Sequence, residues 1–412
     1  MISMKNRSGM LARGSIALTL TALGAACAAG TSDAGNATNA GDAGPDAAAH
    51  DAASSAYDAG TSYDAWVATD ASATQDSGGP RPDAAPTCSG TICNGVCVDT
   101  ENDATSCGAC GHSCSGQACS QGACIPVVVS AQFSPPGRLT HDATNLYWTN
   151  GGGAVNTAPI AGGATTTLAT ATGSAMGVAV DVTNVYFASQ GDGTIYKVAI
   201  AGGARVALAT GQAQPYAVVV DATSVDWTTI GSGAGNGTRM KCAIGGCATP
   251  TTLATGLQYA YGLALDGTYA YWTTLNGGGE VRRVLLGGGG ELAMGSTFVY
   301  PYAVQVNASS FVVLEYGQAG MVWVEPINGG TPLQIAGGQS FPQEMTADTT
   351  AAYWTAWQPG PAGQTVMKCA LTGCNHQPQV MARGVQPTGS IVTDATWVYW
   401  LSNDGTVLKT PK

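Results

Sequence analysis

The sequence predicts an all-β fold built from seven copies of one unit. Each copy carries a short apolar run, an Asp-x-Thr triplet or a variant, and in most copies Tyr-Trp-Thr or a variant. The triplets begin at Asp142, Asp181, Asp221, Asp266, Asn307, Asp348 and Asp394. The steps between them are 39, 40, 45, 41, 41 and 46 residues long. A period near forty residues that holds several short strands is typical of a β-propeller. We therefore predict a seven-bladed β-propeller over residues 125–412.

Each repeat divides into four antiparallel strands, named a to d in chain order. In the second repeat these strands are expected at residues 177–180, 185–188, 194–199 and 205–209. Asp181 suits an Asx turn between strands a and b, because its carboxylate can accept a backbone N–H two residues on. This structural role accounts for the ring of Asp residues, so we assign no catalysis to it.

The last repeat shows only three strands, at residues 390–393, 398–401 and 406–409. The apolar segment Ile125–Ser130 precedes the first repeat and resembles the missing fourth strand. We expect this N-terminal strand to complete the last blade. Closure of the ring would remove the exposed strand edges that invite aggregation.

Residues 1–26 resemble a signal peptide, with Lys5, Arg7 and Arg13 ahead of a short apolar stretch. Cys27 follows small residues, as at a bacterial lipoprotein cleavage site, although Gly24 stands where an aliphatic residue is usual. We expect lipidation at Cys27, with the membrane reached by this anchor alone. The protein would then be exported to the outer membrane or cell surface. Ordinary cleavage and secretion is the alternative.

Residues 27–87 form an Ala/Asp/Gly-rich segment with few aliphatic side chains. Such a segment cannot bury enough apolar surface to repay its ordering entropy, so we expect a disordered tether. From residue 28 it holds nine Asp against one Arg, and therefore most of the net charge of −11. The chain from Ile125 onward has 14 acidic and 11 basic residues, which is not the basic surface of a nucleic-acid binder.

Residues 88–124 form a cysteine-rich module. Its eight cysteines are Cys88, Cys93, Cys97, Cys107, Cys110, Cys114, Cys119 and Cys124. So short a segment has no room for a hydrophobic core, and we expect four disulfides whose connectivity the spacing leaves open. A zinc site is the alternative, but it usually needs two CxxC pairs and the module has one. We expect no metal and no cofactor.

Two later pairs of cysteines lie in the c–d hairpins of repeats three and six. Cys242 and Cys247 flank one four-residue turn, and Cys369 and Cys374 flank the other. The members of each pair face one another across adjacent strands, which predicts two local disulfides. If Cys27 carries lipid, the other twelve cysteines can all be paired.

The Tyr-Trp-Thr strands resemble the YWTD-type propellers of low-density lipoprotein receptors and their bacterial relatives. The cysteine module resembles those that precede propellers in predicted surface lipoproteins of Gram-negative bacteria. The resemblance implies the fold and not the receptor's ligands. The sequence departs from it by having seven repeats rather than six and by lacking the Asp that closes the motif, for example at Asn150 and Thr274.

No motif of a catalytic site stands out. HExxH, GxSxG and P-loop patterns are absent from the sequence, and only 10% of its residues are charged, against roughly 25% in soluble proteins. We expect a monomeric, non-catalytic binding or scaffolding module whose partner is an unknown glycan, peptide or protein. A propeller enzyme of lyase or lactonase type, with a sparse site at the channel mouth, is the alternative, and a purely structural envelope component is a third.

The expected binding face carries the d–a and b–c connections. Its d–a connections are rich in aromatic residues, namely Phe133, Tyr216, Tyr259, Tyr261, Phe298, Tyr300, Tyr302 and Phe341. Five residues before the repeat Asp or Asn, three successive blades place Tyr216, Tyr261 and Tyr302. At the next position of each repeat, four residues before the Asp or Asn, the only charged residues are Arg138 and Glu344. Trp357 stands beside a long b–c loop. These six residues are the predicted ligand site. The alternative is that the tyrosines only seal the core.

Overall fold

The computed structural model describes residues 88–131, 135–231, 235–275, 278–294, 298–357 and 363–412. They all belong to one compact unit, Arg81–Lys412. The predicted signal peptide, Cys27 and the tether lie outside the described residues, as does Phe133. Across the described ranges, no helix is long and apolar enough to cross a membrane.

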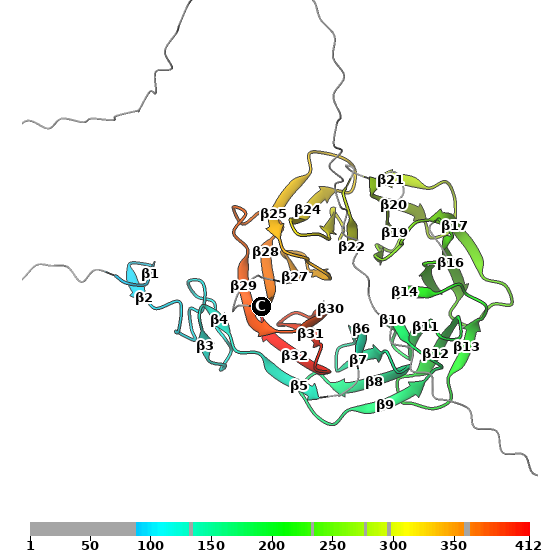
Figure 1. The fold of residues 1–412 in the computed structure, drawn as a ribbon, viewed down its shortest axis with the longest axis horizontal. Coiled ribbons are helices and arrows are strands. Elements are labelled where there is room, and N and C mark those ends of the chain that lie inside the picture. Colours follow the sequence, from blue (N-terminus) through cyan, green and yellow to red (C-terminus); the bar gives the residue numbers. More distant parts are fainter. Residues whose placement is uncertain (1–87, 132–134, 232–234, 276–277, 295–297, 358–362) are drawn as a thin grey trace, which may run out of the picture. The chain divides into compact units, whose positions relative to one another are not determined.

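Seven four-stranded antiparallel sheets stand around a central axis and form a β-propeller (Figure 1). The first strand of each sheet lies nearest the axis. The strands of blades 1 to 4 are β6 (Pro136–His141), β7 (Asn145–Asn150), β8 (Ala154–Pro159) and β9 (Thr166–Thr170); β10 (Ala175–Val180), β11 (Asn184–Ser189), β12 (Thr194–Ala199) and β13 (Val206–Ala209); β14 (Pro215–Val220), β15 (Ser224–Thr229), β16 (Gly237–Ala243) and β17 (Thr251–Leu257); and β18 (Leu263–Leu265), β19 (Tyr269–Thr274), β20 (Glu280–Leu285) and β21 (Leu292–Met294). The strands of blades 5 to 7 are β22 (Pro301–Val306), β23 (Ser310–Glu315), β24 (Gly320–Pro326) and β25 (Leu333–Gln339); β26 (Met345–Ala347), β27 (Ala351–Trp357), β28 (Gln364–Ala370) and β29 (Gln379–Val385); and β30 (Pro387–Thr393), β31 (Trp397–Ser402), β32 (Thr406–Pro411) and β5 (Val127–Ala131).

The ring closes as the sequence predicts. Strand β5 pairs antiparallel with β32, with Thr406 opposite Ala131 and Lys409 opposite Val127. The inner strand of blade 2 begins two residues earlier than expected, at Ala175, because a register shift between Ala175 and Val178 extends it.

The repeated Asp closes each a–b turn in the way its Asx motif predicts. In blade 1, Asp142 Oδ1 accepts the N–H groups of Thr144 and Asn145, each at 2.7 Å. Its Oδ2 accepts a hydrogen bond of 2.6 Å from the Tyr147 hydroxyl. The same Asp–Tyr bond recurs in blades 2, 4, 6 and 7. The motif tyrosine therefore has a polar role, which the repeat pattern alone does not show.

The core consists of the interfaces between blades. Consecutive residues of a strand point to opposite faces, so the motif Tyr packs on the next blade and the following Trp or Phe on the previous one. Tyr147 thus meets Phe187, Tyr186 meets Trp227, and Tyr353 meets Trp400. All five motif tryptophans are fully buried, namely Trp148, Trp227, Trp272, Trp354 and Trp400.

Four disulfides hold the cysteine module together. They join Cys88 to Cys97, Cys93 to Cys110, Cys107 to Cys119, and Cys114 to Cys124. Two short hairpins complete it, β1 (Thr91–Cys93) with β2 (Val96–Val98) and β3 (Cys119–Ser120) with β4 (Ala123–Cys124).

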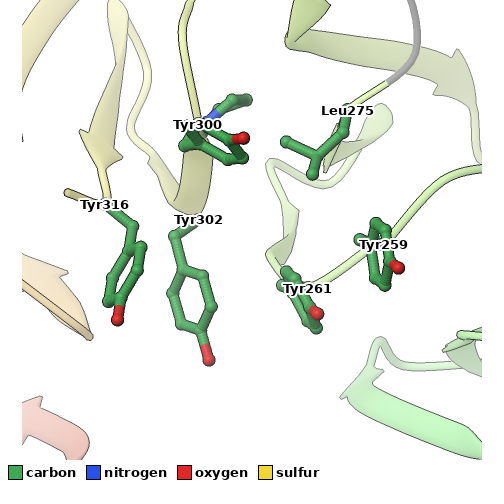
Figure 2. A pocket seen from close by; sticks show the side chains of 7 residues that line it. Tyr259, Tyr261, Leu275, Tyr300, Tyr302 and Tyr316 are labelled. Atoms are coloured by element: carbon green, nitrogen blue, oxygen red, sulfur yellow. The ribbon is translucent and has the colours of Figure 1, made fainter. Parts of the chain in front are cut away.

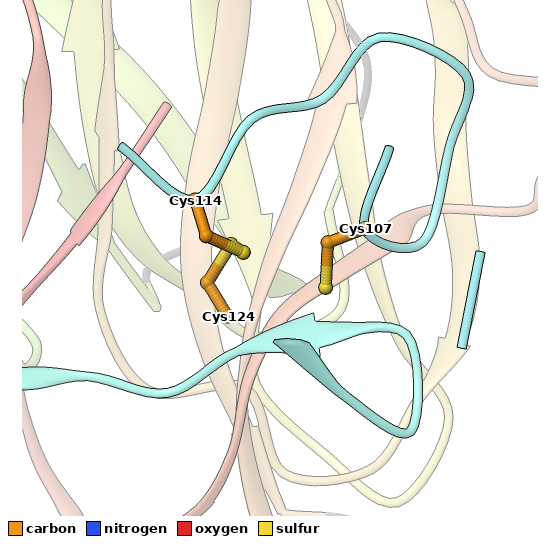
Figure 3. A group of neighbouring side chains, drawn as sticks. All are labelled: Cys107, Cys114 and Cys124. Carbon is orange, nitrogen blue, oxygen red and sulfur yellow. A yellow bond between two sulfur atoms is a disulfide. The ribbon is translucent and has the colours of Figure 1, made fainter. Parts of the chain in front are cut away.

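The sulfur atoms of Cys107, Cys114 and Cys124 lie within 4.8 Å of one another (Figure 3). All three sulfurs are engaged in disulfides, so none is a thiolate that could bind zinc. In the propeller, disulfides link Cys242 to Cys247 and Cys369 to Cys374, the pairs that the hairpin pattern predicts.

Candidate functional site

The predicted site residues come from the d–a and b–c connections or the strand ends beside them. Arg138, Tyr216 and Tyr302 lie near the starts of β6, β14 and β22. Tyr261 and Glu344 precede β18 and β26, and Trp357 ends β27. All six therefore lie at the same end of the propeller, opposite the a–b turns.

The inner strands surround a central cavity of about 160 Å³. One residue from each blade lines it at the register predicted from the repeat, namely Arg138, Gly177, Ala217, Gly262, Ala303, Glu344 and Ser390. Blade 2 requires glycine here, because a Cβ on Gly177 would lie 2.2 Å from the carbonyl oxygen of Tyr216. The close approach of neighbouring inner strands thus narrows the channel.

The two charged members of this ring form an ion pair. Arg138 binds Glu344, and each side chain is 17% exposed. The same guanidinium donates a hydrogen bond of 2.8 Å to the Tyr216 hydroxyl, which lies 3.4 Å from the Tyr302 hydroxyl. The polar groups at the channel mouth therefore largely satisfy one another.

A continuous row of aromatic rings leads away from this ion pair across blades 3 to 6. We call Tyr216, Tyr261, Tyr302, Tyr316, Phe341 and Trp357 the aromatic row. The centroids of successive rings are 5.3, 4.9, 5.8, 5.7 and 6.4 Å apart. Each spacing is within the range of aromatic contact, so the row is one connected surface.

A pocket of about 280 Å³ opens within the aromatic row between blades 4 and 5. Tyr259, Tyr261 and Leu275 form one side, and Tyr300, Tyr302 and Tyr316 form the other (Figure 2). We call it the aromatic pocket. In the part of the chain that the structure describes, the exposed aromatic side chains are Tyr259, Tyr300, Tyr316 and Trp357. All four line the pocket or the row, so exposed aromatic surface is concentrated on this face.

Two aromatic residues of this face are held in left-handed backbone conformations. Tyr259 has a φ of +53° and Phe341 a φ of +42°. Glycine adopts this region without a steric penalty, whereas a bulky side chain is an outlier there. Strained residues of this kind often mark functional sites.

The central phenols stay protonated at neutral pH. Burial raises the pKa of Tyr261, and the neighbouring Tyr216 and Tyr259 raise it further. Burial likewise raises the pKa of Tyr302, although Arg138 acts in the opposite direction. Neither group is placed to serve as a general base near pH 7.

The six predicted residues thus lie in one connected constellation, with Trp357 at its far end. Sequence reasoning left out Tyr259, Tyr300 and Tyr316 as site residues. Tyr259 and Tyr300 were visible as aromatic residues of d–a connections, and Tyr316 as an aromatic residue directly after strand b. Phe298 is buried and seals the core. Parts of the b–c loops of blades 3 and 6, residues 232–234 and 358–362, lie outside the described residues.

Comparisons with known proteins bear on the fold. The chain matches no protein-family model. No curated protein matches it either. The crystal structure of the WD40 β-propeller domain of Doa1 is 12% identical, with a TM-score of 0.54 over 69% of this chain and 95% of that chain.

A computationally designed protein, Ika8, is 14% identical, with a TM-score of 0.51 over 69% of this chain and 98% of that chain. A structure of a nidogen/laminin complex is 18% identical but reaches a TM-score of only 0.42, over 49% of this chain and 80% of that chain. The similarity to the Doa1 domain and to Ika8 supports the propeller fold and carries no activity with it.

Proposed function

We propose that this protein is a non-catalytic binding module of the cell envelope and that the aromatic row binds an extended peptide. The observation that carries the proposal is the concentration of exposed aromatic side chains on one face, around the aromatic pocket. An exposed apolar surface with a polar border is typical of an interaction site.

The lining of the aromatic pocket favours a peptide over a glycan. Ring carbons, Leu275 and Pro301 supply most of it. A sugar buried there would lose hydrogen bonds to water without replacing them, which costs free energy. The charged groups of the channel mouth are already engaged, since Arg138 binds Glu344 and donates to the Tyr216 hydroxyl. A proline or aromatic side chain on an extended peptide suits such a pocket, as in aromatic grooves that bind polyproline segments.

The same proposal places the protein on the cell surface as a lipoprotein anchored through Cys27. The six disulfides support an oxidising environment outside the cytoplasm. Mass spectrometry of the mature N-terminus tests the anchor. A lipid adduct on Cys27 is expected, and an unmodified N-terminus at another residue would contradict it.

The binding proposal is tested with Tyr216, Tyr261 and Tyr302 replaced together by Ala in the full chain. Peptide arrays that include proline-rich sequences, and a glycan array, would be probed with the wild type and with this triple variant. Peptide binding should be lost while the fold, followed by circular dichroism, is kept. Tyr269→Ala is the matched control, because Tyr269 begins β19 at the opposite end of blade 4. Unchanged peptide binding by a folded triple variant would remove this face as the site, and binding to glycans alone would refute the ligand class.

One observation favours the enzymatic alternative, a lyase or lactonase. Arg138, Glu344 and Tyr216 form a charged cluster at the channel mouth, where a propeller enzyme would act. Turnover of an acidic polysaccharide or a lactone by the wild type, abolished in Arg138→Met, would establish this activity in place of simple binding.

A further inference from the structure

The aromatic pocket is lined by five phenol rings, together with Leu275 and Pro301. The rings belong to Tyr259, Tyr261, Tyr300, Tyr302 and Tyr316. Figure 2 shows these side chains around one opening. Within the described ranges, no acidic or basic side chain belongs to this lining. The volume of about 280 Å³ is at the lower end of small-molecule sites, so the pocket suits one compact chemical group.

The faces of these rings carry partial negative charge and attract cations. Elsewhere in the chain, side chains of the protein use this attraction. The Arg283 guanidinium lies 4.4 Å from the centroid of the Tyr269 ring, and the Lys409 ammonium lies 4.7 Å from that of Trp397. Among the described residues, no Lys or Arg makes this contact with any of the five pocket rings. The protein therefore supplies no cation of its own to the pocket rings.

A buried carboxylate adds negative charge behind the pocket. Glu315 directly precedes Tyr316 and is only 4% exposed. Its Oε1 accepts a hydrogen bond of 2.6 Å from the N–H of Val299, the residue before Tyr300, and its Oε2 accepts one of 3.0 Å from the Trp323 indole. In the part of the chain that the structure describes, neither oxygen pairs with a Lys or Arg side chain. This uncompensated charge favours a positive occupant over a neutral one.

The lining also selects among cations. A lysine ammonium has three N–H donors and an arginine guanidinium has five, and burial without acceptors costs each of them its hydrogen bonds to water. Ring carbons, Leu275 and Pro301 supply most of the lining, so it offers few acceptors. A quaternary ammonium group has no N–H donor, and aromatic rings bind such groups well. Arg138 at the channel mouth is paired with Glu344, so its charge is compensated.

We propose that the aromatic pocket binds a quaternary ammonium group, carried as a trimethylated lysine by the peptide on the aromatic row. The inference rests on the proposed function for the peptide itself and goes beyond it by naming the group that enters the pocket. A proline there would gain burial alone, whereas a trimethylammonium group gains burial and attraction to the rings and to Glu315. Tyr261 and Tyr302 belong to both the pocket and the row, so an extended peptide with a lysine at one position can occupy both.

Choline chloride is the first probe, titrated into the full chain at constant ionic strength and followed by saturation-transfer NMR. Its control is 3,3-dimethylbutanol, which has the same shape and no charge. Choline should bind saturably and at least about tenfold more tightly than the neutral alcohol, the difference expected for a desolvated cation on aromatic rings. Acetylated and amidated trimethyllysine should bind at least as tightly as choline, and the unmethylated lysine compound at least about tenfold less tightly.

Variants of Tyr300 test the role of the rings. Tyr300→Leu removes one ring but keeps an apolar side chain at a residue that is 54% exposed, so the fold should be kept. Choline affinity should fall at least about threefold, while affinity for the neutral alcohol stays equal. Tyr300→Phe keeps the ring and should bind choline like the wild type. Tyr269→Leu, at the opposite end of blade 4, is the matched control and should also bind choline like the wild type.

Three results would overturn the proposal: no saturable choline binding, equal binding of choline and 3,3-dimethylbutanol, or unchanged choline binding by a folded Tyr300→Leu variant. If that variant does not fold, Tyr316→Leu replaces it with the same expected loss. Choline binding without trimethyllysine binding would overturn the lysine assignment. Peptide binding on the arrays without choline binding would refute this inference and leave the proposed function standing. Choline binding with no bound peptide would refute the peptide and leave recognition of the ammonium group standing.

Discussion

Blade 3 buries an ion pair at a register where the other six blades have uncharged side chains. This difference predicts that removal of one charged partner lowers the stability of the protein. Asp226 stands at the register of the motif Tyr, and Arg239 stands where the other six blades have Val or Ile. Both side chains are 0% exposed and bind each other. The bond joins Arg239 Nη2 to Asp226 Oδ1, while Asp226 Oδ2 and the Arg239 Nε and Nη1 atoms have no hydrogen-bond partner among the described residues. The pair is therefore fully desolvated and only partly satisfied.

Removing one member of this pair should be costly. Arg239→Val leaves an uncompensated carboxylate in the interface between blades 3 and 4. The expected loss is about 3 to 5 kcal/mol in the free energy of unfolding near neutral pH. For a domain of this size that corresponds to a fall in Tm of roughly 5 to 10 °C.

The cost should depend on pH in a defined direction. Burial raises the pKa of Asp226 to about 6, although the Arg239 guanidinium lowers it. Because the folded pKa exceeds the unfolded value, the contribution of this group to stability is fully present below about pH 4 and is lost as the pH rises through 6. Arg239→Val removes the lowering influence and moves the pKa further up. The variant should therefore be more strongly destabilised at pH 8 than at pH 5.

Restoring the pattern of the other blades should reverse the loss. In Asp226→Tyr/Arg239→Val, the new hydroxyl has the Asp221 carboxylate available, as Tyr147 has Asp142 in blade 1. Replacement of a buried ion pair by packed side chains is often neutral or stabilising by about 1 to 4 kcal/mol. The double variant should thus be at least as stable as the wild type, while Arg239→Val alone is not.

Urea denaturation of the full chain with its disulfides intact, followed by circular dichroism at pH 5 and pH 8, measures the wild type, Arg239→Val, Asp226→Tyr and the double variant. The reasoning fails if Arg239→Val matches the wild type at pH 8. It also fails if the double variant is no more stable than Arg239→Val.

Two further predictions concern the turns. Replacing Cys242 and Cys247 by Ser opens a loop with a sequence separation of only 5 and should cost about 2 kcal/mol, measured by urea denaturation; a loss of folding altogether would contradict the local role of this disulfide. Tyr259→Gly removes a side chain from a residue whose φ is +53°. The free energy of unfolding should stay equal or rise by about 1 kcal/mol. Peptide affinity, measured by calorimetry, should fall at least about tenfold. Lower stability with unchanged affinity would mean that Tyr259 serves packing rather than binding.

The residues that line the channel mouth could be predicted from the sequence, because each inner strand lies at a constant distance along the chain from the repeat Asp or Asn. Counting back from each repeat Asp placed Arg138 and Glu344 at equivalent positions, and the structure joins them in one ion pair. Strand β5 was predictable because the last repeat lacks a fourth strand. In both cases the repeated arrangement of strands and turns along the sequence predicted a contact between residues far apart in the chain.

The aromatic pocket was not predictable in the same way. Leu275 and Tyr316 reach it from b–c connections, whose lengths differ between blades and break the count. The disulfide connectivity of the cysteine module was also out of reach, since its spacing admits many pairings. The pair Asp226–Arg239 joins two separate departures from the repeat, and only the structure shows that they meet.

Departures from the repeat therefore divide into two kinds, and the division can be measured. Asp226 and Arg239 depart together and compensate each other inside one interface, so restoring the repeat pattern there should raise stability and leave binding at the aromatic pocket unchanged. Tyr259 is of the other kind, because it places an aromatic side chain where the backbone favours glycine. Its side chain lines the aromatic pocket rather than the closed core. Selection for folding alone gives no reason to keep a strained tyrosine, whereas binding does. On this argument, a change at Tyr259 should alter ligand affinity far more than it alters the free energy of unfolding.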